Sequence, residues 1–179
     1  MKYLNMSRAY KFPELDLTFA TMTVVGWQEL FTRRVYQDML IDSIQHGIDN
    51  KGLQIFGYVV MPNHVHLLCN SVKEPLGDIF KSVKSFSAKK LRDAVIEHEG
   101  PNRRDRFLNA FRYYKKGNDR DHQIWIHDNQ PKHCYTPEMA QQKLEYIEMN
   151  PVKAGFVDEP HYWRLSSANE HSPLPVLEL

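Results

Sequence analysis

The sequence predicts an α+β domain built around an antiparallel β-sheet, and three observations support this prediction. Short apolar, β-branched runs alternate along the chain with longer segments whose apolar residues recur every three or four positions. Two of the short runs are separated by Pro62 and Asn63, which is typical of a tight hairpin between antiparallel strands. The chain has 179 residues, 42% of them hydrophobic and 25% charged, and this suits one globular domain spanning residues 1–179.

The first strand is predicted at residues 15–25, where apolar and β-branched residues predominate before Gly26. A helix is predicted at residues 28–50, and Asn50-Lys51-Gly52 supplies a stop signal after it. The apolar side chains of this helix repeat at helical spacing, and they are Leu30, Phe31, Val35, Met39, Leu40 and Ile44.

Two strands and a second helix follow. The strands are predicted at residues 53–61 and 64–70, on either side of the Pro62-Asn63 turn. The helix is predicted at residues 75–98, because Pro75 suits a first helical turn and Gly100-Pro101 follows its end.

The next part of the chain has a less regular pattern. Residues 102–116 are predicted to form either a helix or an ordered basic loop that ends before Gly117. A short apolar run predicts a strand at residues 122–127, and residues 128–134 are predicted to form a loop.

A last helix is predicted to begin at Pro137, with Thr136 as its N-cap. It is expected to end at about Asn150, because Pro151 disfavours the helical conformation of the residue before it. Residues 158–179 contain several prolines and are predicted to be a tail on the surface.

The order of these elements contains the split βαβ arrangement of ferredoxin-like folds. In that arrangement the two early helices cover one face of the antiparallel sheet, and the first and third strands are central. His64 and His66 begin the third strand, so the topology places them on a central strand, where the backbone is held rigidly.

Composition excludes several classes of protein. The first residues contain no long apolar segment, and no uncharged apolar stretch approaches the length of a membrane span. The two cysteines, Cys69 and Cys134, form no Cys-x-x-Cys pair, so neither a disulfide scaffold nor a thiolate zinc site is expected. These observations predict a protein of the reducing cytoplasm with no membrane partner.

Basic residues concentrate between Lys81 and Lys116, where eleven basic and four acidic side chains give a local net charge of +7 in a chain of net charge +1. Aromatic residues are interleaved with them: Phe86, Phe107, Phe111, Tyr113 and Tyr114. Cations for phosphates and rings for bases are typical of a groove for single-stranded nucleic acid, but a solvated helix with its aromatic residues in the core is the alternative. The basic residues predicted to contact nucleic acid are Lys81, Lys84, Lys89, Lys90, Arg103, Arg104, Arg106 and Arg112.

His64 and His66 are separated by a single apolar residue in a strand-like run. Residues two apart on a strand point to the same face, so both imidazoles can donate nitrogens to one divalent metal ion. The alternative is a pair of polar residues on the solvent face of a strand. His122, His127 and His133 with Cys134 could suggest a zinc cluster, but their spacing matches no standard site.

The last predicted helix carries Tyr146 and Asn150 four residues apart, on one face. A phenol and a carboxamide on that face could bring a nucleophile and a neutral oxygen ligand to a metal held by the two histidines. The alternative is an interfacial tyrosine and an asparagine that ends the helix.

Two segments resemble a known family. Tyr58-Val-Val-Met-Pro-Asn-His-Val-His-Leu-Leu68 and Lys143-Leu-Glu-Tyr-Ile-Glu-Met-Asn-Pro-Val-Lys-Ala-Gly-Phe-Val157 are similar to the REP-associated tyrosine transposases. These are relatives of the single-tyrosine HUH transposases of insertion sequences. The similarity continues at Val24–Trp27, Trp125–Asn129 and Leu165–Ala168, so it spans nearly the whole chain.

The resemblance implies that His64 and His66 are metal ligands, that Tyr146 is the nucleophile and that Asn150 is a third ligand, where many insertion-sequence transposases have glutamine. It implies Mg²⁺ or Mn²⁺ as the metal and no nucleotide cofactor. The implied reaction nicks and rejoins single-stranded DNA, with hairpin-forming repeats as the partner, through a 5′-phosphotyrosine and a free 3′-OH. The resemblance implies that homodimers are common, although some REP-associated members act as monomers, so a homodimer and a monomer are both compatible with it.

Two other functions are compatible with the residues. A nucleic-acid-binding module without catalysis would keep the basic groove and form no covalent adduct. A metal-dependent hydrolase of small phosphoesters would be indifferent to removal of the Tyr146 hydroxyl.

Overall fold

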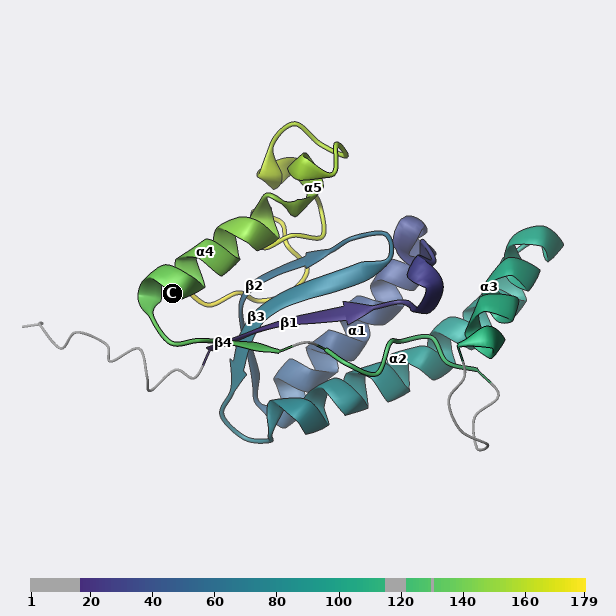
Figure 1. Cartoon of the computed structure of the whole chain (residues 1–179), viewed down its shortest axis with the longest axis horizontal. Coiled ribbons are helices and arrows are strands. Elements are labelled where there is room, and N and C mark those ends of the chain that lie inside the picture. Colours follow the sequence, from purple (N-terminus) through teal and green to yellow (C-terminus); the bar gives the residue numbers. More distant parts are fainter. Residues whose placement is uncertain (1–16, 115–121, 130) are drawn as a thin grey trace, which may run out of the picture.

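A four-stranded antiparallel sheet forms the centre of the computed structural model, which describes residues 17–114, 122–129 and 131–179 (Figure 1). The strands are β1 (Leu17–Thr23), β2 (Leu53–Val60), β3 (His64–Ser71) and β4 (Lys132–Cys134), and they lie in the order β2-β3-β1-β4. The predicted α+β fold with β1 and β3 as central strands is therefore confirmed.

The hairpin between β2 and β3 has the predicted turn. The Met61 amide donates a hydrogen bond to the carbonyl of His64, at 2.8 Å, around Pro62 and Asn63. Across the neighbouring β1–β3 ladder, His66 is opposite Thr21 and His64 is opposite Thr23. The two histidines are therefore anchored in the sheet by backbone pairing on both sides of β3.

Helices cover both faces of the sheet. On one face lie α1 (Arg34–Lys51) and α2 (Leu76–His98), the two early helices expected together, followed by α3 (Pro101–Tyr113). On the other face α4 (Pro137–Glu148) packs against β2 and β3, and the short α5 (Asn150–Lys153) continues from it. As a result, α4 packs against the strand side chains on one face of the sheet, and α1 and α2 pack against those on the other face.

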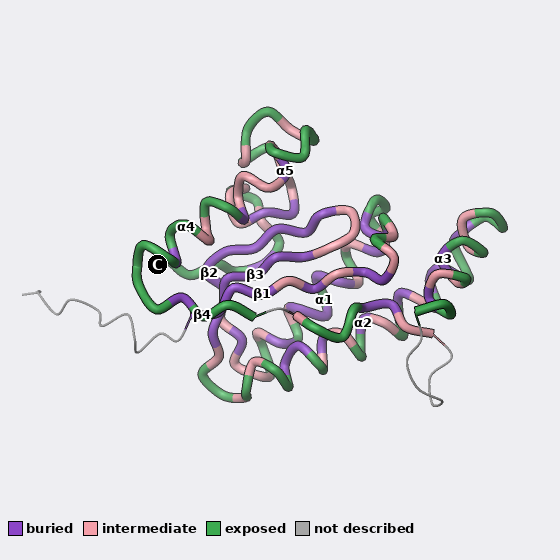
Figure 2. Tube along the Cα trace, viewed as in Figure 1, coloured by how far each residue is buried: buried purple, intermediate pink, exposed green. Residues whose placement is uncertain are grey.

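Alternation along β3 divides the core into two clusters. Val65, Leu67 and Cys69 lie in the larger cluster beneath α1 and α2, whereas Leu68 lies in the smaller cluster beneath α4. Figure 2 shows that β2 and β3 are buried along most of their length. Because side chains alternate between the two faces along a strand, His64 and His66 lie on the same face as Leu68 and point toward α4.

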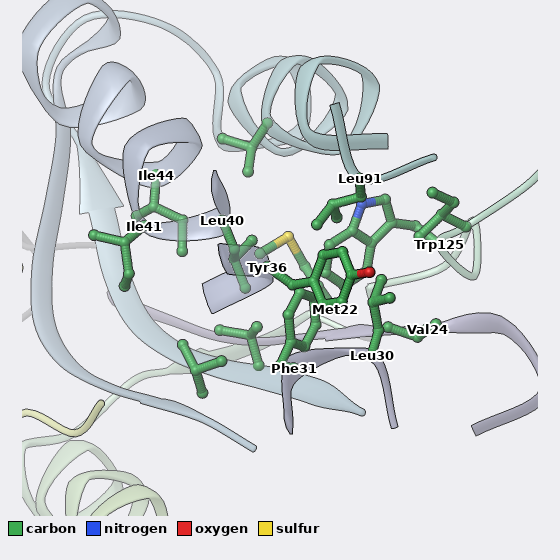
Figure 3. Packing of buried hydrophobic residues seen from close by; sticks show 14 of the residues in the cluster. Met22, Val24, Leu30, Phe31, Tyr36, Leu40, Ile41, Ile44, Leu91 and Trp125 are labelled. Carbon is green, nitrogen blue, oxygen red and sulfur yellow. The ribbon is translucent and has the colours of Figure 1, made fainter. Parts of the chain in front are cut away.

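An aromatic contact in the larger cluster joins Phe31, which precedes α1, to α2 through Trp125 (Figure 3). The rings of Phe31 and Trp125 stack with centroids 5.6 Å apart, and the Trp125 indole donates a hydrogen bond to the Ser87 hydroxyl of α2. Full burial of one large apolar side chain is worth roughly 1.5–3 kcal/mol, so this contact is a substantial part of the packing at this corner.

Two predicted elements differ from the structure. The helix expected from residue 28 begins at Arg34, after the 3-10 turns η2 (Val25–Trp27) and η3 (Leu30–Thr32). The reason is that the amide of Phe31 donates to the carbonyl of Pro62, which ties this segment to the hairpin instead of a helix.

The fourth strand also differs from its prediction. At residues 122–127 there is a single bridge, between Trp125 and Val24, and the ladder with β1 lies at β4, where a loop was expected. Ile124 and Trp125 are consecutive and both enter the larger cluster, which regular strand alternation does not allow.

The remaining predicted helices are close to their expected bounds. The segment from residue 102 is helical, as α3, and the part of the prediction at residues 115–116 lies outside the described residues, as does the start of the first strand at 15–16. The Thr136 hydroxyl accepts from the Met139 amide, as expected of an N-cap. The helix that carries Tyr146 ends at Glu148, and α5 then begins at Asn150.

Residues after η4 (Pro160–Tyr162) run beside β2. Ser166 forms a bridge with Val59, and the Val60 amide donates to the carbonyl of Leu165 at 2.9 Å. Further on, the Leu177 amide donates to the carbonyl of Ile55. The C-terminal segment therefore satisfies backbone groups on the outer edge of β2. No helix among the described residues is long and apolar enough to cross a membrane.

Candidate active site

His64 and His66 lie side by side on the face of the sheet that α4 covers. Their ring centroids are 4.6 Å apart and their planes are inclined by 69°. His66 is buried and His64 is partly exposed, so the pair forms a site that is closed on one side and open on the other. This is the common face that the His-x-His spacing predicts.

Each imidazole is oriented through its Nδ1 atom. The Nδ1–H of His64 donates to the side-chain oxygen of Asn63 at 2.6 Å, and Nδ1 of His66 is hydrogen-bonded to the Thr21 hydroxyl at 2.8 Å. A hydrogen bond at Nδ1 orients the ring and directs Nε2 toward a metal ion. The pair thus fits a divalent ion that takes one Nε2 from each ring.

Burial keeps both imidazoles uncharged. Desolvation lowers the pKa of His64, and desolvation together with the neighbouring His64 lowers the pKa of His66 to about 3. A neutral imidazole is the form that binds a metal, so protons do not compete for these nitrogens near neutral pH.

Tyr146 reaches the same place from α4. Its ring centroid is 5.3 Å from that of His66, and the two rings meet at 64°. The Phe19 ring stacks on His66 at 5.2 Å and meets Tyr146 edge-on at 5.8 Å. Tyr146 remains 40% exposed, so a phenol held against the histidine pair is still open to a substrate.

The position of α4 depends on a close approach to β2. A Cβ added at Gly57 would lie 2.5 Å from Cδ1 of Leu144 and 3.8 Å from Cδ1 of Ile147. Ile147, the neighbour of Tyr146, is fully buried in the smaller cluster. Glycine at position 57 therefore leaves room for the Leu144 side chain of α4, the helix that carries Tyr146.

Two lysines lie over aromatic rings of the site, and the sequence did not single them out. The ammonium of Lys153 is 5.9 Å from the centroid of the Tyr146 ring, and that of Lys143 is 5.2 Å from the Phe19 ring. Their positions three residues before and seven residues after Tyr146, at helical spacing, were the signal that could have found them. Two cations at this place favour an anionic substrate.

Asn150 stands at the first position of α5, one helical turn after Tyr146. Among the hydrogen bonds of the described residues, none joins its side chain to either histidine, while its carbonyl accepts from the Ala154 amide. No group of three or more His, Cys, Asp and Glu side chains that could hold a metal occurs in the described part of the chain.

Trp27 lies at the open side of the pair. Its indole is 64% exposed and meets His64 edge-on, with centroids 5.8 Å apart. Sequence reasoning noted this residue as part of the resemblance and gave it no role in the site.

Two of the basic residues expected to bind DNA are bound within the protein. The Arg103 Nε lies 3.3 Å from the fully buried carboxylate of Glu99, which also accepts a 2.7 Å hydrogen bond from the Tyr36 hydroxyl. The Lys84 ammonium donates to the carbonyls of Ile126 and His127, and burial lowers the pKa of Lys84 to about 8. Both side chains join α2 or α3 to a neighbouring segment.

The other predicted DNA contacts remain on the surface. Lys81, Lys89 and Lys90 are exposed on α2, and Lys90 lies over the exposed ring of Phe86. On α3, Arg104 pairs with Asp105, Arg106 lies over the Phe107 ring and Arg112 contacts Asn109.

The aromatic residues of this segment divide into two groups. Phe107 and Phe111 are buried, as the alternative interpretation of the segment expected, whereas Tyr113 and Tyr114 are exposed. Lys115 and Lys116 lie outside the described residues.

Comparison with known families agrees with the arrangement of the strands and histidines. The family model described as "Transposase IS200 like" matches residues 21–127, which include the end of β1, both histidines and α3. The chain belongs to the IS200-like transposase family. The match ends before α4, so it includes neither Tyr146 nor Asn150.

Seven solved chains match this IS200-like transposase in structure. One is described as a REP-associated tyrosine transposase bound to a REP hairpin, with a TM-score of 0.56, 18% identity, and coverage of 86% of this chain and 77% of that one. At that identity the likeness shows a shared fold. Another solved chain is a protein of Deinococcus radiodurans R1 whose description names a transposase. It has 20% identity with this chain and covers 73% of this chain and 88% of its own. Its TM-score of 0.36 is too low to support an argument about the fold. No curated protein matches the sequence.

Proposed function

We propose that this IS200-like transposase cuts and rejoins single-stranded DNA through a covalent bond between Tyr146 and a 5′-phosphate. The observation that carries the proposal is the 5.3 Å separation of the ring centroids of Tyr146 and His66, which come from α4 and β3. A tyrosine that served only to pack α4 would not need to be held half-exposed against a pair of oriented, neutral imidazoles.

The histidine pair fits a divalent metal, and we assign it to Mg²⁺ or Mn²⁺ with the amide oxygen of Asn150 as third ligand. Imidazoles favour softer ions than Mg²⁺, and Mn²⁺ tolerates mixed nitrogen and oxygen ligands better. When bound, such an ion supplies a Lewis acid that polarises the scissile phosphate and leaves positions for water or phosphate oxygens.

The residues of the chain account for the rest of the reaction. The Tyr146 oxygen loses its proton and forms a bond to phosphorus, while the bond from phosphorus to the 3′ oxygen breaks and that oxygen leaves as a 3′-OH after gaining a proton. The phosphotyrosine conserves one phosphodiester bond. A 3′-OH from the same or another strand can therefore attack it, which releases Tyr146 and rejoins DNA without ATP.

Lys143 and Lys153 supply charge at the reacting phosphate. The Lys153 ammonium lies over the Tyr146 ring and the Lys143 ammonium over the Phe19 ring, and we place the reacting phosphate beside these two rings. Fixed positive charge at the place where negative charge gathers on phosphorus stabilises the transition state.

The proposed substrate is a single strand carrying a hairpin. The solved relative with the shared fold is described as bound to a REP hairpin, and this supports a similar partner here. The exposed lysines of α2 and arginines of α3 add sequence-independent attraction for the phosphates of such a strand.

The test is incubation of the protein with single strands from its own flanking genomic repeats, with Mn²⁺ and with a chelator in parallel, followed by a denaturing gel. A protein–DNA adduct that requires Mn²⁺ is expected. Binding of the strand with no adduct would replace the proposal with a catalytically silent DNA-binding protein. Turnover of a chromogenic phosphodiester that survives Tyr146→Phe would replace it with a small-phosphoester hydrolase.

A further inference from the structure

The turn from Val25 to Gln28 holds a strained backbone beside the candidate active site. The Gln28 amide donates to the Val25 carbonyl at 3.4 Å, and both residues between them have positive φ, 61° at Gly26 and 54° at Trp27. Glycine adopts this left-handed conformation at little cost, but a bulky tryptophan rarely does. Trp27 is the one non-glycine residue with positive φ in the described part of the chain.

Packing does not explain this strain. The chain has three tryptophans: Trp125 is 4% exposed, Trp163 is partly buried, and Trp27 is 64% exposed. The indole of Trp27 makes an edge-on contact with His64, and most of the surface of this residue is open to solvent. A strained backbone that presents a large ring to solvent at an active site is a reason to expect a ligand for that ring.

Two further exposed rings continue from the same turn. A Cβ at Gly26 would lie 2.9 Å from Cε2 of Tyr114, so the Tyr114 ring packs directly on the backbone of the turn. Tyr114 is 44% exposed, and its ring meets that of Tyr113, which is 81% exposed, at a centroid distance of 5.0 Å. Tyr114 therefore lies against the turn that carries Trp27, and we call Tyr113, Tyr114 and Trp27, which lie between the end of α3 and His64, the aromatic row.

We infer that the aromatic row is a base-binding platform, on which Trp27 stacks a base next to the scissile phosphate and the two tyrosines hold the bases that follow. The inference rests on the proposed function, because it takes single-stranded DNA as the ligand. Exposed aromatic faces bind bases of any sequence, and rigid rings do so with little loss of conformational entropy. The row would therefore position a strand at the histidines without selecting its sequence.

The test compares three substitutions at Trp27 in the full chain, with single-stranded oligothymidylate as the probe. Trp27→Phe keeps an aromatic face, Trp27→Leu keeps apolar bulk in the same strained backbone, and Trp27→Gly removes both ring and strain. Binding by the Leu and Gly variants should weaken about tenfold, and binding by the Phe variant should stay within about threefold of the wild type. The matched control is Tyr135→Ala, an exposed ring beside β4 at the other end of β1.

Two further readouts separate stacking from structure and from charge. Trp27→Gly should raise the temperature of unfolding, because glycine adopts positive φ without strain. Weaker binding by a more stable variant cannot be explained by damage to the fold. The slope of affinity against salt should be unchanged in the Leu variant, because every cation that meets a phosphate is retained. In the wild type, oligothymidylate should quench the fluorescence of the exposed indole.

The outcomes distinguish this inference from the function on which it rests. Equal affinity of the wild type and the Leu variant, in a protein that forms the Tyr146 adduct, would overturn the platform and leave the proposed function standing. A decrease in binding by the Phe variant as severe as that of the Leu variant would also overturn it. A selective decrease in the Leu and Gly variants, with no adduct from the wild type, would support the platform and overturn the strand-transfer function.

Discussion

The hydroxyl oxygen of Thr21 lies 2.8 Å from Nδ1 of His66, across the ladder that joins the two central strands. This bond, together with the Phe19 ring stacked on the imidazole, fixes the orientation of the ring. Removal of a side chain that hydrogen-bonds to a metal-binding histidine commonly weakens metal affinity by about ten- to a hundredfold.

Thr21→Val should therefore weaken metal binding while the fold is retained, because valine has the shape of threonine without its hydroxyl. We expect adduct formation to require about tenfold more Mn²⁺ and to approach the wild-type rate when Mn²⁺ is raised. The measurement is the adduct yield as Mn²⁺ is titrated. Thr21→Ser keeps the hydroxyl and is the matched control; equal metal requirements in the Val variant and the wild type would remove Thr21 from the site.

Tyr146→Phe should abolish the covalent adduct and leave single-strand binding within about twofold, because the change removes one oxygen and keeps the ring contacts with Phe19 and His66. Mass spectrometry of a digest of the wild-type adduct should locate the nucleotide on the peptide that contains Tyr146. An adduct formed by the Phe variant, or mapped to another tyrosine, would contradict the assignment of the nucleophile and leave the metal site unaffected.

Gly57→Ala should disturb the packing of α4 on β2, because the added methyl would lie 2.5 Å from Cδ1 of Leu144 and the Leu144 side chain would have to move. We expect a decrease of about 1–3 kcal/mol in unfolding free energy and a fall in adduct formation that exceeds any fall in DNA binding. Denaturant unfolding and single-turnover adduct assays give the two quantities. The double variant Gly57→Ala with Leu144→Ala makes room for the methyl, so it should recover adduct formation relative to the single variant.

Acid should destabilise the metal-free protein through the buried imidazoles. In the unfolded chain His66 takes up a proton near pH 6.5, whereas in the fold its pKa is about 3. Between these values the unfolded state binds a proton that the folded state does not, so the free energy of unfolding decreases as the pH falls from about 6.5 toward 3.

For one imidazole this decrease amounts to as much as about 2 kcal/mol between about pH 7.5 and about pH 5. Denaturant unfolding at the two pH values measures it. The variant His66→Asn lacks the titrating group and should show a flatter dependence on pH; an identical dependence in both proteins would contradict the low pKa of His66.

Substitution of the exposed lysines of α2 should affect DNA binding, whereas substitution of Arg103 should affect the stability of the fold. Neutralising Lys81, Lys89 and Lys90 together should weaken binding to unrelated single strands and flatten the salt dependence by about 0.7 in slope for each lysine that meets a phosphate. Arg103→Gln should instead lower the free energy of unfolding by at least about 1 kcal/mol, because it removes a cation from the buried carboxylate of Glu99. Salt titrations and denaturant unfolding of both variants distinguish the two effects, and an unchanged slope in the lysine variant would move the DNA path away from α2.

The sequence sufficed to predict the parts of the site that depend on local periodicity. The two-residue period of a strand puts His64 and His66 on one face, and the order of elements puts that strand at the centre of the sheet. The contact between Tyr146 and His66 depends on how α4 packs against β2, where Gly57, in a distant part of the chain, leaves the room that Leu144 occupies. Periodicity along one helix contains no such information.

The same limit explains the misplaced elements. Trp125 has the sequence context of a strand residue because its neighbours are β-branched, but its indole turns into the core toward Phe31 and Ser87 and interrupts the strand. Arg103 has the context of a surface cation because its local segment is basic. Its neighbour Glu99 is buried against the Tyr36 hydroxyl, and Arg103 itself donates to the Thr32 hydroxyl, so distant residues hold the pair in place. In both cases a tertiary contact overrides the local pattern.

The C-terminal segment closes one side of the sheet to other chains. Its backbone occupies the outer edge of β2 at Ile55, Tyr58 and Val60. An open edge strand is a template onto which another chain can add a strand of its own. While this segment is in place, two copies of the protein cannot join their sheets through β2, and a homodimer has to use a different surface. Detachment of the segment would leave backbone N–H and C=O groups of β2 unpaired and open to strands of other chains, so its docking protects the protein from self-association through this edge.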